Sequence, residues 1–308
     1  MVTGANGFVG AALCDTLEAA GLRVRRAVRT SSRPAEIAVG SIGSDTDWIP
    51  ALAESEVVIH LAARVHVMKD SSADALCAYR EVNSTGTRRL AEQAASSGIR
   101  RFIYLSSIKV NGEGTVPGSP YGPSDEPRPE DPYGLSKLEA ERAIAEIAGR
   151  SGMEFVVVRP PLIYGPGVRA NFHSMMRLVQ RGIPLPLGCV TGNRRSLLSL
   201  ENLNHLLLNC LDNPAAANRT LLASDGEDLS TADLLRRLGL AIGQPARLLP
   251  VPVPLLDFGA RLLGRQDLAR RLLGSLQVDI GETRKVLGWN PPVSVDEGIR
   301  RAAISILN

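Results

Sequence analysis

The chain has 308 residues, 44% hydrophobic and 22% charged, which is enough to bury one large α/β core or two smaller ones. This balance excludes a disordered, a collagen-like or a coiled-coil protein. The 35 basic and 32 acidic residues leave a net charge of +3 and are interspersed along the chain, so we expect no nucleic-acid partner.

The first half of the chain alternates between short apolar runs and segments with helical periodicity. A very short strand precedes Thr3, so either the natural start lies upstream or this strand is clipped. We predict a helix from Phe8 until Gly21 ends it, further helices at 76–97 and 133–149, and strands at 22–28, 57–61, 102–105 and 155–158. This alternation is typical of a doubly wound parallel sheet.

The second half is less regular. Ser230 and Asp233 resemble a capping box at the start of a helix. Residues 112–132 contain six prolines and four glycines between the end of a strand and the start of a helix. Loops of this length inside compact domains are usually functional or disordered, so we expect this one to flank an active site.

Two further features restrict the setting of the protein. No apolar run reaches the roughly 20 residues that a bilayer span needs, and no signal peptide is recognisable, so we expect a cytoplasmic protein without membrane insertion. The four cysteines are scattered and form no CxxC pair. We therefore expect neither disulfides nor a metal site.

A glycine-rich turn lies between the first strand and the first helix, where Gly4, Gly7 and Gly10 form a GxxGxxG pattern. Glycine allows a tight turn and lets a pyrophosphate approach where a side chain would block it. The helix that follows offers N–H donors and the positive end of its dipole. The pattern favours dinucleotide binding over a plain turn. The expected cradle is Gly4, Asn6, Gly7, Phe8, Val9 and Gly10.

Several segments together resemble the extended short-chain dehydrogenases/reductases, the family of NDP-sugar epimerases and dehydratases. The glycine turn has the TGxxGxxG spacing of that family rather than the GxGxxG of ordinary dehydrogenases. The resemblance covers nearly the whole chain. Its other motifs are HLAA at 60–63, VNxxGT at 82–87, YxxxK at 133–137 and a D…LGW end at 279–289.

This resemblance implies a Rossmann-type α/β fold with a smaller, mixed C-terminal domain. We expect residues 1–160 to bind the dinucleotide, with segments near 196–225 returning to that domain, and residues 161–308 mainly to bind substrate. The family also implies a two-fold homodimer through the helices at 76–97 and 133–149. The positions expected to border the cofactor are Leu61, Ala62, Ala63, Pro160 and Ile163.

Tyr133 and Lys137 are four residues apart, so a helix places them on one face. A free tyrosine has a pKa of about 10, and a neighbouring lysine charge would favour its phenolate form. Ser107 follows a buried strand, where α/β sheets place ligands, and takes the family's catalytic position in SxxVxG, with Ser106 as the competing choice. We predict that Ser107, Tyr133 and Lys137 are catalytic, with Tyr133 and Lys137 also contacting the cofactor.

In the 4,6-dehydratases of the family an Asp-Glu pair follows the catalytic Thr and performs the elimination. This chain has Ile108-Lys109 instead, so loss of water from the sugar is not expected. Redox chemistry at one carbon or epimerisation remains.

The choice of cofactor depends on the end of the second strand. NAD-preferring members usually carry an acidic residue there for the ribose hydroxyls, and residues 24–33 contain none. Arg29 would attract a 2′-phosphate, so NADP(H) is favoured and NAD(H) is the alternative. Ser41 and Ile42 stand where members often have an adenine-contacting Asp.

On the substrate side, Asn171 matches the family's diphosphate-facing asparagine, and Arg195 its diphosphate-gripping arginine. A second arginine is expected near Arg270 or Arg271, without a choice between them. The whole chain, including residues 65–70 and 109–114, looks most similar to bacterial UDP-sugar 4-ketoreductases of surface-polysaccharide synthesis.

Three functions therefore remain. The leading one is NADPH-dependent reduction of the C4 keto group of a UDP-4-keto-6-deoxy-N-acetylhexosamine. The second is a UDP-sugar 4-epimerase with tightly bound NAD. The third, a dinucleotide-binding sensor without turnover, is disfavoured because such proteins often lose Tyr or Lys, and this chain keeps both.

Overall fold

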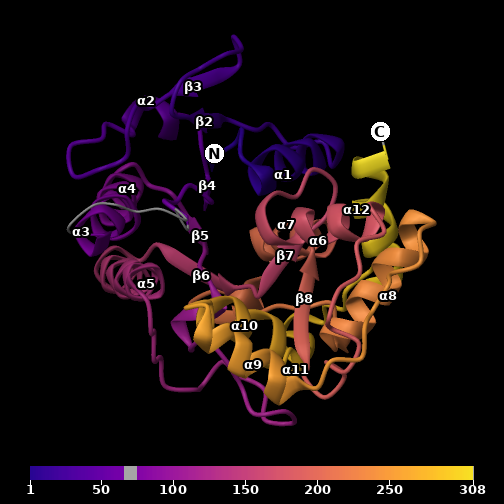
Figure 1. Cartoon of the computed structure of the whole chain (residues 1–308). Helices are drawn as coiled ribbons and strands as arrows, with labels where there is room; N and C mark the ends of the chain where they lie inside the picture. Colours follow the sequence, from indigo (N-terminus) through magenta and orange to yellow (C-terminus); the bar gives the residue numbers. More distant parts are fainter. Residues whose placement is uncertain (66–74, 308) are drawn as a thin grey trace.

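A seven-stranded parallel sheet forms the centre of the larger half of the molecule (Figure 1). The computed structural model describes residues 1–65 and 75–307. The strand order is β3-β2-β1-β4-β5-β6-β9, with every pairing parallel, so the predicted Rossmann-type sheet is confirmed. The strands are β1 (Val2–Thr3), β2 (Arg26–Val28), β3 (Glu36–Ala38), β4 (Val57–His60), β5 (Arg101–Leu105), β6 (Glu154–Arg159) and β9 (Arg219–Leu222).

Helices cover both faces of this sheet because each buried strand is apolar on both of its sides. Along β5, Ile103 packs into one core, and its neighbours Phe102 and Tyr104 pack into the other. The first core lies under α1 (Phe8–Ala19) and α7 (Leu200–Asp212), the second under α4 (Gly86–Ser96) and α5 (Pro132–Ser151). Short α2 (Ile49–Leu52) and α3 (Ala75–Tyr79) lie on the second face beside α4 and α5.

Some predicted bounds differ from the structure. The helix expected at 76–97 is α3, a π-helical turn at Arg80–Thr85, and then α4. The strand expected at 22–28 begins only at Arg26, because Gly21 ends α1 and the chain needs four residues to return to the sheet. Strand β3 was not predicted, since three half-exposed residues at a sheet edge carry no apolar alternation.

The smaller half is built on a mixed three-stranded sheet, as predicted. β8 (Arg195–Ser199) pairs parallel with β7 (Leu162–Tyr164) and antiparallel with β10 (Asp228–Leu229). Around the core beside this sheet lie α6 (Ala170–Gln180), α8 (Thr231–Ile242) and α12 (Val295–Leu307). Ser230 caps α8, accepting from the backbone N–H of Asp233 at 3.0 Å, and its hydroxyl donates to the Asp233 carboxylate at 2.7 Å. The predicted helix start is therefore confirmed, with one of the two bonds of a full capping box.

The remaining helices are short. α9 (Val253–Leu262) and α10 (Gln266–Leu273) lie side by side at the surface, and α11 (Gly281–Leu287) precedes the Gly288 turn (Figure 1). Within 196–225, β9 joins the large sheet, whereas β8 belongs to the small one. Across residues 1–65 and 75–307, no helix is both long and apolar enough to cross a membrane.

Candidate active site

One cavity of about 1720 Å³ runs along the carboxyl ends of the large sheet and is lined by residues of both halves. Open α/β sheets bind ligands at this edge. The structure brings every site residue predicted from the sequence to this one cavity, and the role of each stays a prediction. They are Gly4, Asn6, Gly7, Phe8, Val9, Gly10, Arg29, Leu61, Ala62, Ala63, Ser107, Tyr133, Lys137, Pro160, Ile163, Asn171 and Arg195.

The glycine turn between β1 and α1 has no room for side chains. Gly4 has a φ of +64°, and a Cβ there would lie 3.0 Å from the backbone nitrogen of Ala62. A Cβ on Gly10 would lie only 2.1 Å from the carbonyl oxygen of Gly4. Gly7 precedes α1, and no side chain caps the first N–H groups of that helix. These donors fit the diphosphate of a dinucleotide, because the turn leaves them accessible from the cavity.

A buried clamp joins this turn to the end of β4. The hydroxyl of Thr3 accepts from the backbone N–H groups of Leu61 and Ala62, both at 3.1 Å. Its own proton therefore points to Nδ1 of His60 at 2.6 Å. Nε2 of His60 then carries the ring proton and donates to the hydroxyl of Thr87 at 2.9 Å. The clamp positions the segment that begins with Leu61 against the glycine turn.

The buried His60 predicts acid sensitivity. Burial first, and then the charge of Lys137, lowers the pKa of His60 from 6.5 to about 3. The unfolded chain takes up a proton below pH 6.5 that the folded chain does not take up until about pH 3. Each pH unit in this window therefore lowers the free energy of unfolding by about 1.4 kcal/mol.

Denaturant unfolding at pH 7, 6 and 5 measures this slope. We expect His60→Gln to flatten it relative to the wild type. Equal slopes in the wild type and His60→Gln would contradict the assignment.

The start of α5 positions the predicted catalytic pair. Asp131 caps the helix by accepting from the N–H of Gly134 at 2.6 Å, and Pro132 occupies its first turn. A Cβ on Gly134 would lie 2.7 Å from the carbonyl oxygen of Lys109, so the helix start fits closely against the 3₁₀ turn at Ile108–Val110. This contact sets Tyr133 beside Ser107, whose hydroxyl lowers the pKa of the phenol.

The electrostatics of this pair differ from the sequence prediction. Burial is the largest cause that raises the pKa of Tyr133, followed by the charge of Asp131, while the hydrogen bond with Ser107 lowers it. Burial likewise lowers the pKa of Lys137 to about 7. Nζ of Lys137 donates to the carbonyl of Leu105 at 2.8 Å and lies 5.9 Å from the centroid of the Tyr133 ring. The expected lowering of the Tyr133 pKa by Lys137 is therefore wrong for the protein alone.

The two neighbouring serines have separate environments. Ser106 is buried, and its hydroxyl donates to the carboxylate of Glu141. Both serines line the cavity, but Ser107 is the more exposed, and its hydroxyl accepts only a long hydrogen bond from the N–H of Lys109 at 3.3 Å. The geometry favours Ser107 over Ser106 as the serine that meets a ligand.

Lys109 occupies the position of the dehydratase acid–base pair. Its ammonium donates to Glu113 at 2.7 Å and to Asp131 at 2.5 Å, and all three line the cavity. Hydrogen bonds to these carboxylates raise the pKa of Lys109 against the effect of burial. A lysine held charged in this way does not supply the acid–base pair of an elimination.

Three arginines, Arg195, Arg270 and Arg271, line the cavity. Burial lowers the pKa of Arg195, the charge of Glu113 raises it, and that of Arg271 lowers it. Arg270 and Arg271 on α10 both line the same cavity, as does Asn171 on α6. Acidic side chains share this region, since Arg270 pairs with Glu130 at 3.6 Å and Glu113 acts on Arg195. Both arginines between which the sequence made no choice line the cavity.

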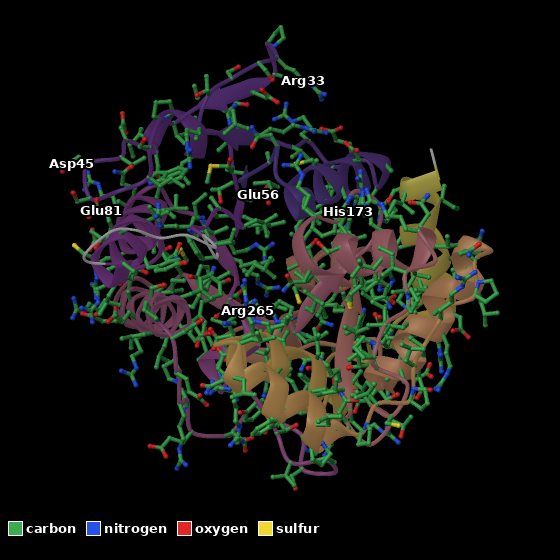
Figure 2. All side chains as sticks on the ribbon, viewed as in Figure 1. Arg33, Asp45, Glu56, Glu81, His173 and Arg265 are labelled. Atoms are coloured by element: carbon green, nitrogen blue, oxygen red, sulfur yellow. The ribbon has the colours of Figure 1, made fainter. Side chains whose placement is uncertain are left out.

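Arg29, which was expected to choose the cofactor, is exposed and lines the cavity. Ser41 and Ile42 line it too. Glu81 of the π-helical turn holds this loop by accepting from the N–H of Ser44 at 3.1 Å. Figure 2 shows Glu81 near Asp45 at this edge of the molecule. No acidic side chain lines this end among the described residues.

Sequence reasoning missed the residues that support the site from behind. Asn83 accepts from the N–H of Arg64 at 2.7 Å and donates to its carbonyl and to the hydroxyl of Ser136, both at 3.0 Å. It thereby ties the segment after β4 to α5. The VNxxGT motif at 82–87 contains Asn83 and could have pointed to it, but the resemblance assigned no role to this residue. In the part of the chain that the structure describes, no group of His, Cys, Asp or Glu could hold a metal ion.

A protein-family model described as the NAD dependent epimerase/dehydratase family matches residues 1–218. The chain belongs to this family. Among its relatives, a UDP-glucose 4-epimerase of Vibrio cholerae is 48% identical over 100% of this chain and 95% of its own. An N-acetyl-alpha-D-glucosaminyl-diphospho-ditrans,octacis-undecaprenol 4-epimerase of Escherichia coli O157:H7 is 28% identical over 98% of this chain and 93% of its own.

Solved structures of the epimerase/dehydratase family share the fold. The UDP-glucose 4-epimerase of Thermotoga maritima with UDP-glucose has a TM-score of 0.80 at 22% identity, over 99% of this chain and 97% of its own. The UDP-glucuronic acid 4-epimerase of Bacillus cereus with NAD has a TM-score of 0.77 at 20% identity, over 99% and 97%.

These comparisons correct one prediction. The finer resemblance was to 4-ketoreductases, whereas the relative at 48% identity bears the name of a 4-epimerase. Part of that resemblance, residues 66–70, lies outside the described residues. The short segment at 109–114, which it also used, forms the Lys109–Glu113 ion pair beside the site.

Proposed function

We propose that this protein is an NAD-dependent 4-epimerase of a UDP-linked hexose. The observation that carries the proposal is the meeting of Ser107, Tyr133 and Lys137 with the Gly4–Gly10 cradle on one cavity. The V. cholerae relative, 48% identical over the whole chain, supports a 4-epimerase over a reductase.

The chain's own residues would handle the proton at C4. Tyr133, as phenolate, accepts the proton of the C4 hydroxyl, and Ser107 orients that oxygen by a hydrogen bond. A nicotinamide held by the Gly4–Gly10 cradle would supply the hydride acceptor and donor for C4, so that no external oxidant or reductant would be needed. Tyr133 then gives the proton back, so the sugar leaves with its C4 configuration inverted and nothing is consumed.

Lys137 would act together with Tyr133 and with the bound cofactor. Its side chain lies one helical turn after Tyr133 and reaches the same cavity, so its charge can favour the phenolate when it is protonated. Burial raises the pKa of Tyr133, and an oxidised nicotinamide bound beside it would add a positive charge that favours the phenolate.

The diphosphate of the substrate would lie against Arg195, with Arg270 or Arg271 as the second cation and Asn171 as a further donor. Guanidinium groups bind phosphate oxygens through paired donors. A homodimer through α4 and α5 remains part of the proposal, and the mass in solution tests it.

A second candidate, the NADPH-dependent 4-ketoreductase, is favoured by one observation. Arg29 lines the end of the cavity where the described residues place no acid, which suits a 2′-phosphate. The two candidates differ in what happens to the cofactor, because an epimerase regenerates it and a reductase consumes it.

The deciding experiment uses the purified protein and its Arg29→Asp variant. We expect bound NAD to be released on denaturation, and UDP-hexose C4 epimers to interconvert without net formation of NAD(P)H. Arg29→Asp should weaken NADP(H) binding by about 10- to 100-fold, the loss of one charged hydrogen bond, and leave epimerisation unchanged. Stoichiometric consumption of NADPH, lost in the variant, would establish the reductase instead.

A further inference from the structure

A buried polar network lies directly behind the candidate site. The carboxylate of Glu141 on α5 accepts from Nε and Nη2 of Arg159, at 3.0 and 2.5 Å, and from the hydroxyl of Ser106. Arg159 also donates from Nη1 to the side-chain oxygen of Asn111 at 3.1 Å. The two charged side chains are only 6% and 5% exposed. This is a fully engaged ion pair inside the protein.

The network joins the elements that carry the site. Glu141 follows Lys137 by one helical turn and Tyr133 by two, so all three share a face of α5. Ser106 directly follows β5 and precedes Ser107, while Arg159 is the last residue of β6. No atom of Glu141, Arg159 or Asn111 lines the cavity, so the network acts on a ligand only through the residues in front of it.

Few charges surround Lys137. On α5 it meets Tyr133 and Glu141, on β5 the ring of Tyr104 lies 4.5 Å from its Nζ, and on β4 it faces His60. Tyr104 and His60 are neutral at pH 7, since burial raises the pKa of the first and lowers that of the second. Among the described residues, Glu141 carries the negative charge that raises the pKa of Lys137, and Arg159, which binds the same carboxylate, carries the charge that opposes it.

We propose that Glu141 is a positioning residue whose carboxylate, fixed by Arg159 and Ser106, keeps Lys137 charged and holds the end of β5 that bears Ser107. The carboxylate itself exchanges no proton with a ligand. A buried ion pair is a poor source of stability, because desolvating both charges offsets their attraction. The presence of this ion pair behind the site is explained if the site needs the charge of Glu141.

The consequence is sharp because Lys137 titrates close to neutral pH. Burial lowers the pKa of Lys137 and the charge of Glu141 raises it, and the net result is a pKa of about 7. A small loss of negative charge nearby therefore converts most of the lysine to its neutral form at pH 7. That this charge matters for turnover rests on the proposed function, whereas the titration itself does not.

The chain has only four lysines, Lys69, Lys109, Lys137 and Lys285, which makes a direct measurement practical. In protein labelled with ¹³C at lysine Cε, each signal is assigned from a Lys→Arg variant and followed by NMR from pH 5 to 10. We expect the Lys137 midpoint to fall by about one pH unit or more in Glu141→Gln. Glu139→Gln is the matched control, because Glu139 lies on the same helix and pairs with Arg80 near the surface.

Glu141→Gln leaves Arg159 charged and unpaired inside the protein, so it can fail to fold. The double variant Glu141→Gln/Arg159→Met then decides, since it leaves no unpaired buried charge. We expect the midpoint to fall in the same direction but by less, because the loss of the Arg159 charge opposes the loss of the Glu141 charge. An unchanged Lys137 midpoint in the folded variant, or an equal shift in Glu139→Gln, would overturn the proposal.

Enzyme kinetics separate this proposal from the proposed function. If the protein epimerises UDP-hexoses, the pH optimum of kcat should move to lower pH in Glu141→Gln by the same amount as the NMR midpoint. A purely structural role would lower kcat at every pH and leave the optimum in place. If no epimerase activity is found, the proposed function fails, and the NMR midpoint still tests the role of Glu141.

Discussion

Tyr133→Phe should lower the turnover of UDP-hexose epimerisation by about 10²–10⁴-fold, the usual contribution of a positioned acid–base group. The substitution removes the phenol oxygen and keeps the ring, which contacts Tyr79 edge-on at 6.0 Å between centroids. The fold and the cradle at Gly4–Gly10 are untouched, so the protein should still bind NAD. Epimer interconversion with saturating substrate, followed by NMR of the sugar, measures the change.

Tyr121→Phe is the matched control for this experiment. Its hydroxyl donates to the carbonyl of Gly114 at 2.7 Å in the loop beside the site, and Tyr121 does not line the cavity. Turnover close to wild type is expected there. Near-normal turnover in Tyr133→Phe would remove Tyr133 from the mechanism.

Gly10→Ala should weaken dinucleotide binding by about 10- to 100-fold. The new Cβ would lie 2.1 Å from the carbonyl oxygen of Gly4, and neither atom can rotate away, because the backbone fixes the position of both. Overpacking of this kind costs about 1–3 kcal/mol, and every 1.4 kcal/mol is tenfold in affinity. The turn must open to relieve the contact, which displaces the N–H groups that would hold the diphosphate. Calorimetric titration with NAD after its removal by partial unfolding measures the loss.

Gly149→Ala provides the comparison, because a Cβ at this position on α5 meets nothing within 4 Å. It should bind NAD as the wild type does and be slightly more stable, since alanine favours the helix. Equal affinity for NAD in Gly10→Ala and wild type would show that the cofactor does not use the glycine turn.

The parts of the fold that sequence patterns predicted are those with strong local signals. The central strands β4, β5 and β6 are uninterrupted apolar runs, and α5 is a 20-residue helix bounded by Asp131 and Gly152. The two-residue β1 was recognised only because Gly4 follows it. Strand β3 and the small-sheet strands are short and depend on their partners, so no run of residues announces them.

For the site, a linear motif identifies which residues face the cavity but not their electrostatic state. The YxxxK spacing correctly predicts that Tyr133 and Lys137 lie on one helix face. It does not reveal that burial lowers the pKa of Lys137 to about 7, because that depends on β4 and β5 covering the side chain. Glu141 and Arg159 are 18 residues apart and form no motif, so their pairing emerges only from the folded sheet.

The π-helical turn at Arg80–Thr85 sets the angle about the helix axis between Tyr79 and Asn83, which contact two different parts of the site. A regular helix turns 100° per residue, and a π turn takes up one extra residue without ending the helix. Tyr79 before the turn rests on Tyr133, while Asn83 within it binds the backbone of Arg64. Deleting one residue here would let the helix wind regularly. If Asn83 kept its contact with Arg64, Tyr79 would then be rotated away from Tyr133. The length of this segment is thus constrained by angular alignment as well as by its contacts.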